Sequence, residues 1–153
     1  MIRVPESPTP SSPGRARKMA AIQPRDTQPE KRIRSLLHRR GLRFRVDQAL
    51  RVDSGRPIRP DIVFSRQRVA VFVDGCYWHG CQEHGRRADG KNAHYWLPKI
   101  ERNQERDREH EARLASSGWT VVRFWEHVPP EQAAAEIAKA VERRRKTDDR
   151  VRR

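Results

Sequence analysis

The stretch that decides the fold is residues 59–75, "RPDIVFSRQRVAVFVDG", which holds two short apolar runs separated by a polar tetrapeptide. The runs at 60–64 and 69–73 are rich in β-branched side chains and are almost continuously apolar. This composition predicts two strands that are covered on both faces. The intervening "SRQR" predicts that they form a hairpin. An aspartate marks one end of each strand, Asp61 in the first and Asp74 directly after the second.

Helical and extended segments flank the hairpin on both sides. Before it, Thr27 and Glu30 form a capping-box pattern, which predicts the start of a helix that ends at Gly41. Alternation and apolar periodicity predict the other elements, namely a strand at 42–46, a helix at about 93–117, a buried strand at 119–125 and a helix at 129–145. The order α-β-β-β-α-β-α predicts an α/β fold in which helices flank a mixed central sheet.

The charge of the chain indicates a polyanion as its partner. Its 153 residues include 34 lysines and arginines against 20 acidic residues, a formal net charge of +14. Nucleic acid is the first candidate for such a field. No apolar stretch reaches the length of a membrane span, and the first residues lack the apolar core of a signal peptide. We therefore expect a cytoplasmic protein.

Composition divides the chain into three parts. Residues 1–16 are rich in Pro, Ser and Arg, which is typical of a disordered segment. Residues 17–146 contain all the expected helices and strands and are long enough to bury a modest core as one domain. Residues 147–153 are expected to form a basic C-terminal tail.

Both cysteines lie in the loop after the second strand of the hairpin. The pattern Cys76-x4-Cys81-x2-His84 places three metal-binding side chains within nine residues. In a reducing compartment, cysteines beside histidines favour a metal site over a disulfide. A closed tetrahedral zinc site needs a fourth ligand, and His127, which ends the run "VVRFWEH", is the best candidate. The alternative is two free thiols beside surface histidines.

The two aspartates at the strand ends are candidates for a second, harder metal. In a hairpin, Asp61 and Asp74 lie side by side, and carboxylates so placed can hold Mg²⁺ for phosphate chemistry. The alternative is that each carboxylate serves a turn. His79 follows closely in the sequence, and a histidine near such a site can act as a general acid or base. His79 could instead be the zinc ligand, which would leave His84 exposed to solvent.

The long helix at 93–117 carries polar residues where apolar ones are expected. Asn103 and Asp107 fall on the same face as Trp96 and Ile100. Polar groups on a buried stripe need hydrogen-bond partners. We interpret Asn103 and Asp107 as a structural network that ties the helix to the cysteine loop, in preference to a direct catalytic role.

Two adjacent rings, Tyr77 and Trp78, stand in the cysteine loop. They are either part of the core or wedges that enter between base steps of DNA. Met19, in the basic arm "GRARKMA", could act as a wedge from the other side.

These motifs together resemble a known family. The segments "RPDIVFSRQRVAVFVDGCYWHGC", "KIERNQERDREHEARLASSGWTVVRFWEH" and "KMAAIQPRDTQPEKRIRSLLHRRGLRFRV" closely resemble the very short patch repair (Vsr) endonucleases, over roughly residues 15–145. The resemblance implies a restriction-endonuclease-like core of the PD-(D/E)xK type, Mg²⁺ dependence and a structural Zn²⁺. It also implies that the enzyme nicks one strand 5′ to the thymine of a T·G mismatch, the product of deaminated 5-methylcytosine.

Carried over by position, the resemblance implies a role for each site residue. Asp61 and the backbone carbonyl of Val73 would hold Mg²⁺, and His79 would be the catalytic histidine. Glu30 would contact the site through water, and its capping role can hold at the same time. The zinc positions are Cys76, Cys81, His84 and His127, and the intercalating positions are Met19, Tyr77 and Trp78.

The chain departs from the family pattern at two places. Asp74 stands where the best-studied pattern has a second histidine, so it either takes over a catalytic role or is an extra metal ligand. His84 and His127 stand where cysteine can occur, which keeps a tetrahedral set of ligands.

The resemblance also implies the partners. We expect a monomer that acts at the bacterial nucleoid on double-stranded DNA with a T·G mismatch and is functionally linked to a DNA cytosine methyltransferase. One alternative is a nuclease of the same fold with another DNA substrate, such as restriction- or methylase-linked processing. Another is a non-catalytic, zinc-containing DNA-binding module, against which the presence of Asp61 and His79 argues.

Overall fold

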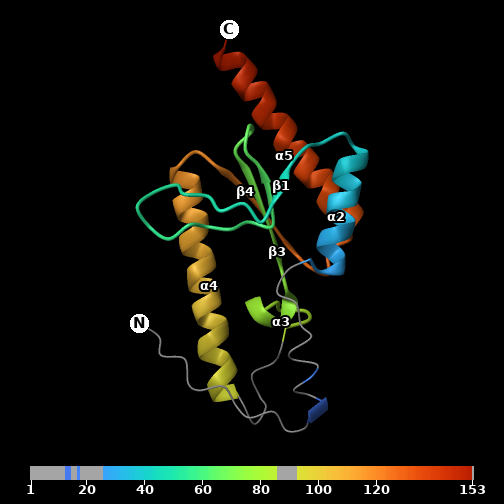
Figure 1. Cartoon of the computed structure of the whole chain (residues 1–153). Helices are drawn as coiled ribbons and strands as arrows, with labels where there is room; N and C mark the ends of the chain where they lie inside the picture. Colours follow the sequence, from blue (N-terminus) through green and yellow to red (C-terminus); the bar gives the residue numbers. More distant parts are fainter. Residues whose placement is uncertain (1–12, 15–16, 18–25, 86–92, 153) are drawn as a thin grey trace.

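The computed structural model describes residues 13, 14, 17, 26–85 and 93–152. Met19 and most of the segment 1–16 therefore lie outside the described residues. The labelled elements are α2 (Gln28–Arg39), β1 (Arg45–Val46), β2 (Ile62–Phe64), β3 (Val69–Asp74), α3 (Cys76–His79), α4 (Ala93–Ser116), β4 (Thr120–Trp125) and α5 (Pro130–Val151). Figure 1 shows the strands between α4 on one side and α2 with α5 on the other.

A four-stranded mixed sheet in the order β1-β2-β3-β4 forms the centre of the molecule. β2 and β3 pair antiparallel through the predicted hairpin, whereas β3 and β4 pair parallel. α4 connects these two parallel strands, as the crossover of a parallel pair requires. The predicted α/β class with a mixed sheet and flanking helices is confirmed.

Two core clusters cover the two faces of the hairpin strands. On one face, Ile62 and Val71 pack against apolar residues of α2 and α5. On the other face, Val63 and Ala70 pack beneath Leu114 of α4 and the segment around Leu50 and Ile58. Side chains alternate between the faces of a strand, so burial on both faces accounts for the nearly continuous apolar runs of β2 and β3.

Three elements differ from the sequence-based expectation. The strand predicted over 42–46 is limited to Arg45–Val46, because β2 offers only three residues for pairing and Asp47 turns the chain with a φ of +54°. β4, predicted as buried, is half-buried along its length, because it is an edge strand of the sheet. α5 continues to Val151, past the predicted end at 145.

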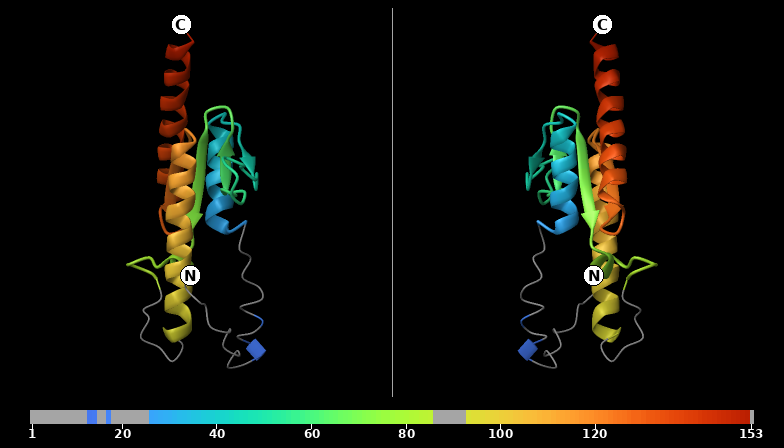
Figure 2. Two further views of the ribbon diagram at one scale, coloured as in Figure 1. Left: turned by 90° about the vertical axis from the view of Figure 1, so that its left-hand side faces the viewer. Right: turned by 90° about the vertical axis from the view of Figure 1, so that its right-hand side faces the viewer.

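The site region lies at one end of the sheet. Figures 1 and 2 show α3 beyond the end of β3, next to the N-terminal half of α4. α5 extends in the opposite direction, beyond the other end of the strands. Among the helices of the described residues, none combines the length and apolarity needed to cross a membrane.

Candidate active site and metal centre

The parallel pairing of β3 with β4 brings the functional segments together. The register runs from Val69↔Thr120 to Asp74↔Trp125, so both strands end at the same edge of the sheet. The backbone N–H of Glu126 extends the ladder by donating to the carbonyl of Asp74 at 2.9 Å. Segments about 50 residues apart in sequence therefore leave the sheet side by side, as is common for sites at the carboxyl ends of strands.

Four metal-binding side chains meet just beyond this edge. The ligand atoms of Cys76, Cys81, His84 and His127 all lie within 4.8 Å of one another. His127 Nδ1 is 3.0 Å from the Sγ atom of Cys76 and 3.8 Å from that of Cys81. Zinc–ligand distances of about 2.0–2.3 Å put the ligand atoms of a tetrahedral site about 3.3–3.8 Å apart. The spacing of the cluster therefore suits a metal ion with tetrahedral coordination. Of the two histidines considered as the third ligand, the cluster contains His84 and not His79.

A single turn of helix, α3, holds the loop in this shape. The Glu126 carboxylate accepts a hydrogen bond from the backbone N–H of Cys76 at 2.8 Å, which ties the start of α3 to the end of β4. Gly80 ends the turn with a φ of +73°. A Cβ atom there would lie 2.6 Å from the Nε2 atom of Gln104, so both the backbone angle and the close packing on α4 favour glycine.

The two thiols differ in acidity. Burial and the neighbouring Cys81 thiol raise the pKa of Cys76 to about 11. Burial also acts on Cys81, but the backbone N–H groups of His84 and Glu83 outweigh it, and the pKa of Cys81 is lowered. A metal ion bound by both thiols would therefore displace a tightly held proton from the pair.

The histidine in the middle of the loop faces helix α4. His79 Nδ1 lies 2.6 Å from Oδ2 of Asp107 and 3.8 Å from Oδ1 of Asp74. A carboxylate only accepts hydrogen bonds, so Nδ1 donates to Asp107 and Nε2 is the nitrogen that can exchange a proton. The pKa of Asp107 lies below its usual value. Burial acts to raise it, but the hydrogen bond and the charge of His79, together with the charge of Arg123, outweigh burial.

The predicted network between the long helix and the loop is present. Asn103 Nδ2 donates to the carbonyl of Trp78 at 2.9 Å, and Gln104 Nε2 donates to that of His79 at 3.0 Å. Together with the His79–Asp107 contact, these bonds fix the backbone and the side chain of the loop to one face of α4.

Arg123 is a site residue that the sequence reasoning missed. Its Nη1 atom is 3.1 and 3.0 Å from the two carboxylate oxygens of Asp74 and 3.3 Å from Oδ2 of Asp107. Its guanidinium carbon lies 4.6 Å from the centroid of the Phe72 ring. The available signal was a lone arginine within the otherwise apolar run "WTVVRFW".

Asp61 directly precedes β2 and is hydrogen-bonded to β3. Its Oδ2 accepts a hydrogen bond from the backbone N–H of Val73 at 2.7 Å. Burial raises the pKa of Asp61 to about 6 against the effect of this bond, and the charges of Glu30 and Asp74 add to the rise. Asp61 and Asp74 are thus electrostatic neighbours, but Asp74 is paired with Arg123 and groups with His79 and Asp107.

Glu30 is buried at the start of α2, near this charge cluster. Its carboxylate accepts from the Thr27 hydroxyl at 2.9 Å and from the backbone N–H of Asp26 at 3.0 Å. The helix begins after Thr27 as predicted, but the capping-box expectation is wrong in detail, because the Thr27 side chain makes no bond to a helix N–H. The hydroxyl instead orients the Glu30 carboxylate.

The two rings of the loop are half-buried and pack on α4. The Tyr77 and Trp78 centroids are each 5.5 Å from that of Trp96, and 4.7 Å from each other. Lys99 Nζ lies 5.4 Å from the Trp78 centroid. The rings therefore form one aromatic cluster beside the metal-binding loop.

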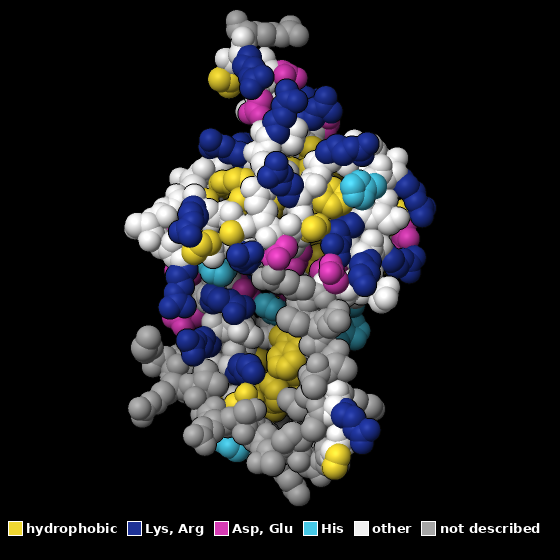
Figure 3. Space-filling view, in the orientation of Figure 1, with side chains coloured by type: hydrophobic (Ala, Val, Ile, Leu, Met, Phe, Trp, Pro, Cys, Tyr) yellow, Lys and Arg dark blue, Asp and Glu magenta, His cyan; other side chains and the backbone are white. Residues whose placement is uncertain are grey.

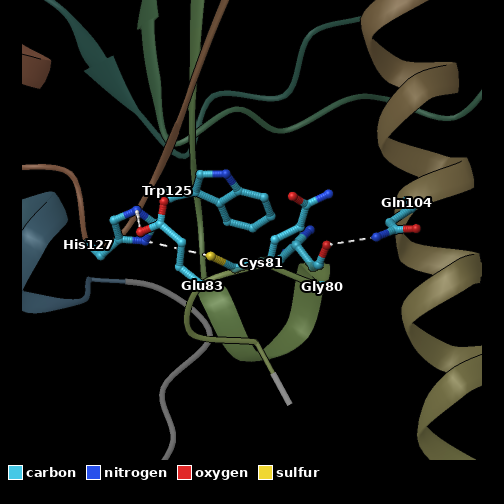
Figure 4. Close-up of a pocket in the computed structure, with 8 residues that line it drawn as sticks. Gly80, Cys81, Glu83, Gln104, Trp125 and His127 are labelled. Atoms are coloured by element: carbon cyan, nitrogen blue, oxygen red, sulfur yellow. Dashed lines mark hydrogen bonds and ion pairs between the residues drawn. The ribbon is translucent and has the colours of Figure 1, made fainter. Parts of the chain in front are cut away.

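A pocket of about 380 Å³ lies between His79 and the cysteine–histidine cluster. Its lining includes Gln104 from α4, Trp125 from the end of β4, and Glu83. Figure 4 shows Glu83 and His127 facing one another across its rim, where Oε2 and Nε2 are 3.6 Å apart.

Comparisons with known proteins give one consistent result. The family model described as "DNA mismatch endonuclease Vsr" matches residues 9–84. The chain is 45% identical over 130 residues to "Type II nicking enzyme V.NaeI" of Lentzea aerocolonigenes, covering 85% of this chain and 78% of that protein. It is 44% identical over 111 residues to "Type II nicking enzyme V.XorIIP" of Xanthomonas oryzae pv. oryzae, with coverage of 71% and 76%. It is 41% identical over 112 residues to "DNA mismatch endonuclease Vsr" of Escherichia coli K12, with coverage of 73% and 69%.

Proposed function

The chain belongs to the Vsr family of DNA mismatch endonucleases, and on that basis we propose that it uses Mg²⁺ to nick one DNA strand 5′ to the thymine of a T·G mismatch. The observation that carries the proposal is His79, whose Nδ1 is bound to Asp107 at the sheet edge where Asp61 and Asp74 also lie. A histidine with one nitrogen fixed and the other available, beside buried carboxylates, suits hydrolysis of a phosphodiester.

Asp61 and the carbonyl oxygen of Val73 are the proposed ligands of the divalent cation. The raised pKa of Asp61 reflects burial and the nearby negative charges of Glu30 and Asp74, a surplus that a cation would relieve. When bound there, Mg²⁺ would supply positive charge to the scissile phosphate.

His79 moves the proton in the proposed reaction. Its Nε2 atom accepts a proton from the attacking water or returns one to the leaving 3′ oxygen, while Nδ1 stays on Asp107. Asp107 thus keeps the ring in one orientation and one tautomer during the reaction. Glu30, oriented by the Thr27 hydroxyl, is placed in the proposal as a contact to the site through water.

The cysteine–histidine cluster is proposed to hold a structural zinc ion. Two thiols and two imidazoles are a donor set that zinc prefers, and their spacing suits its tetrahedral geometry. Zinc would fix the loop that carries His79, Tyr77 and Trp78. We propose that these two rings enter the base stack beside the mismatch, where pairing is weakest.

The charge of the chain supports a DNA partner. The net charge is +14, and Figure 3 shows lysine and arginine side chains over much of the visible face. Such side chains contact phosphates without reading sequence. We propose that the enzyme acts as a monomer in the cytoplasm. We also propose a link to a DNA cytosine methyltransferase, because T·G mismatches arise from methylated cytosine.

A nicking assay tests the proposal. The purified full chain is incubated with end-labelled duplexes that differ only in carrying T·G, T·A or C·G at one position, with and without Mg²⁺. We expect one cut, in the T strand, on the 5′ side of the mismatched thymine, and only with Mg²⁺. Equal cutting of all three duplexes would favour the alternative of a same-fold nuclease with another DNA substrate.

A further inference from the structure

Arg123 occupies the middle of the charge cluster that surrounds His79. One atom, Nη1, lies within 3.3 Å of carboxylate oxygens from both Asp74 and Asp107. All three side chains are shielded from solvent, with relative exposures of 20% for Arg123, 9% for Asp74 and 16% for Asp107. At such burial the ion pairs are weakly screened, so the cation strongly affects where both carboxylates lie.

The guanidinium is held by charge more than by hydrogen bonds. Its Nε and Nη2 atoms are buried and have no hydrogen-bond partner among the residues that the structure describes. The Phe72 ring, 4.6 Å from its central carbon, supports it from below. Unpaired buried donors cost stability. A residue placed only to stabilise the fold would be better bonded, so this position indicates a role in the site.

The residues around Arg123 offer the donor atoms of a metal site. Asp74, His79 and Asp107 offer ligand atoms within 4.8 Å of one another. Two carboxylates and one histidine are a set that binds divalent transition metals. The Nη1 atom contacts both of these carboxylates, so a metal ion and the guanidinium would compete for the same oxygens.

We propose that Arg123 is a positioning residue of the nicking reaction, a built-in cation that takes the place of a metal ion between Asp74 and Asp107. It keeps Asp107 aligned on His79 and it withholds Asp74 from the ligand set of the catalytic metal. The role in nicking rests on the proposed function. The exclusion of a metal does not, and it can be measured without DNA.

The first experiment measures Mn²⁺ binding to the zinc-loaded full chain by electron paramagnetic resonance. All variants carry Asp61→Ala, which removes the proposed catalytic metal site. With Arg123 present, we expect no Mn²⁺ bound at this edge of the sheet. Adding Arg123→Leu should create a site for one Mn²⁺ ion per chain, and adding Asp74→Leu as well should abolish it. Arg113→Leu is the matched control, since Arg113 pairs with Asp53 elsewhere on the surface, and it should bind no Mn²⁺.

The second experiment uses variants that keep Asp61, and it distinguishes an effect of Arg123 on the alignment of His79 from an effect on DNA binding. Arg123→Leu should lower the single-turnover nicking rate of a T·G duplex by about 100-fold, the scale expected for a misaligned catalytic group. The dissociation constant should change by less than about threefold, because phosphate contacts elsewhere remain. Arg123→Lys, which keeps a cation, should recover part of the rate.

The two experiments fail in different ways. A folded Arg123→Leu chain that gains no Mn²⁺ overturns the inference, whatever the activity of the parent. If Arg123→Leu does not fold, Arg123→Gln provides the same comparison with more of the shape kept, and the same result overturns the inference. A parent that does not nick T·G duplexes defeats the proposed function, while the Mn²⁺ measurement still decides whether Arg123 stands in for a metal ion.

Discussion

His79 and Asp107 share the shortest contact described between the cysteine loop and α4, with 2.6 Å between Nδ1 and Oδ2. Asp107→Asn keeps the shape of the side chain but offers an amide in place of the carboxylate. The ring then loses its fixed tautomer and its counter-charge. We expect the single-turnover nicking rate to fall by about 100-fold, with zinc content and duplex affinity unchanged. Asp53→Asn, at an ion pair away from the site, is the control and should nick normally. A normal rate in Asp107→Asn would show that His79 needs no partner.

The cysteine–histidine cluster predicts one tightly bound zinc ion per chain. Cys76→Ala and His84→Ala should each lose zinc and lower the melting temperature, because metal binding contributes to the free energy of folding. His79→Ala should retain zinc but fail to nick. Metal analysis of the three purified variants checks this. Zinc lost from His79→Ala and kept in His84→Ala would reverse the assignment of the two histidines.

Substitutions in the aromatic cluster can distinguish two roles of Trp78, as a wedge that enters the DNA or as a core residue. Trp78→Ala should weaken binding to a T·G duplex by about tenfold or more, since base–aromatic stacking is worth about 1–3 kcal/mol. Because Trp78 packs on Trp96, a modest loss of melting temperature is also expected. Trp96 is the control, being 6% exposed, and Trp96→Ala should cost more stability. If Trp78→Ala leaves the T·G to T·A affinity ratio unchanged, Trp78 is a core residue only.

The raised pKa of Asp61 predicts that replacing its carboxylate by a neutral amide stabilises the folded chain, and that this gain depends on pH. Its folded-state pKa is about 6 against an ordinary 3.8, so the folded chain holds the proton more tightly than the unfolded chain. The stability linked to that proton is complete below about pH 4 and is lost as the pH rises through 6. Without added Mg²⁺, Asp61→Asn should therefore be more stable than the parent at pH 8, by at most about 3 kcal/mol. Urea unfolding at pH 8 and pH 4.5 measures the gap, and a gap that does not shrink at pH 4.5 would contradict the raised pKa.

Local patterns in the sequence were enough to predict much of the molecule. The hairpin of β2 and β3, the mixed sheet with flanking helices, the family and the enzyme class are confirmed. These features depend on apolar runs and on motifs that are close together in the chain. The structure of the segment before the hairpin was harder to predict from the sequence. Leu42 and Phe44 pack against the core without joining the sheet, which alternation alone does not reveal.

The charge network could not be predicted from spacing. Arg123 and Asp74 are 49 residues apart, and only the register of two parallel strands brings them together. The sequence therefore left open whether Asp74 is a metal ligand or a substitute for a histidine. The structure adds a third possibility, that Asp74 is the ion-pair partner of Arg123. This role could not be considered before Arg123 was known to lie beside Asp74.

The parallel alignment of β3 with β4 also has a consequence for biosynthesis. His79 and the cysteines are translated before Arg123 and His127, which lie in and just after the later strand β4. A nascent or truncated chain that ends before β4 lacks His127 of the cysteine–histidine cluster and the Arg123 cation between the aspartates. We therefore expect a chain that ends before β4 not to cut DNA.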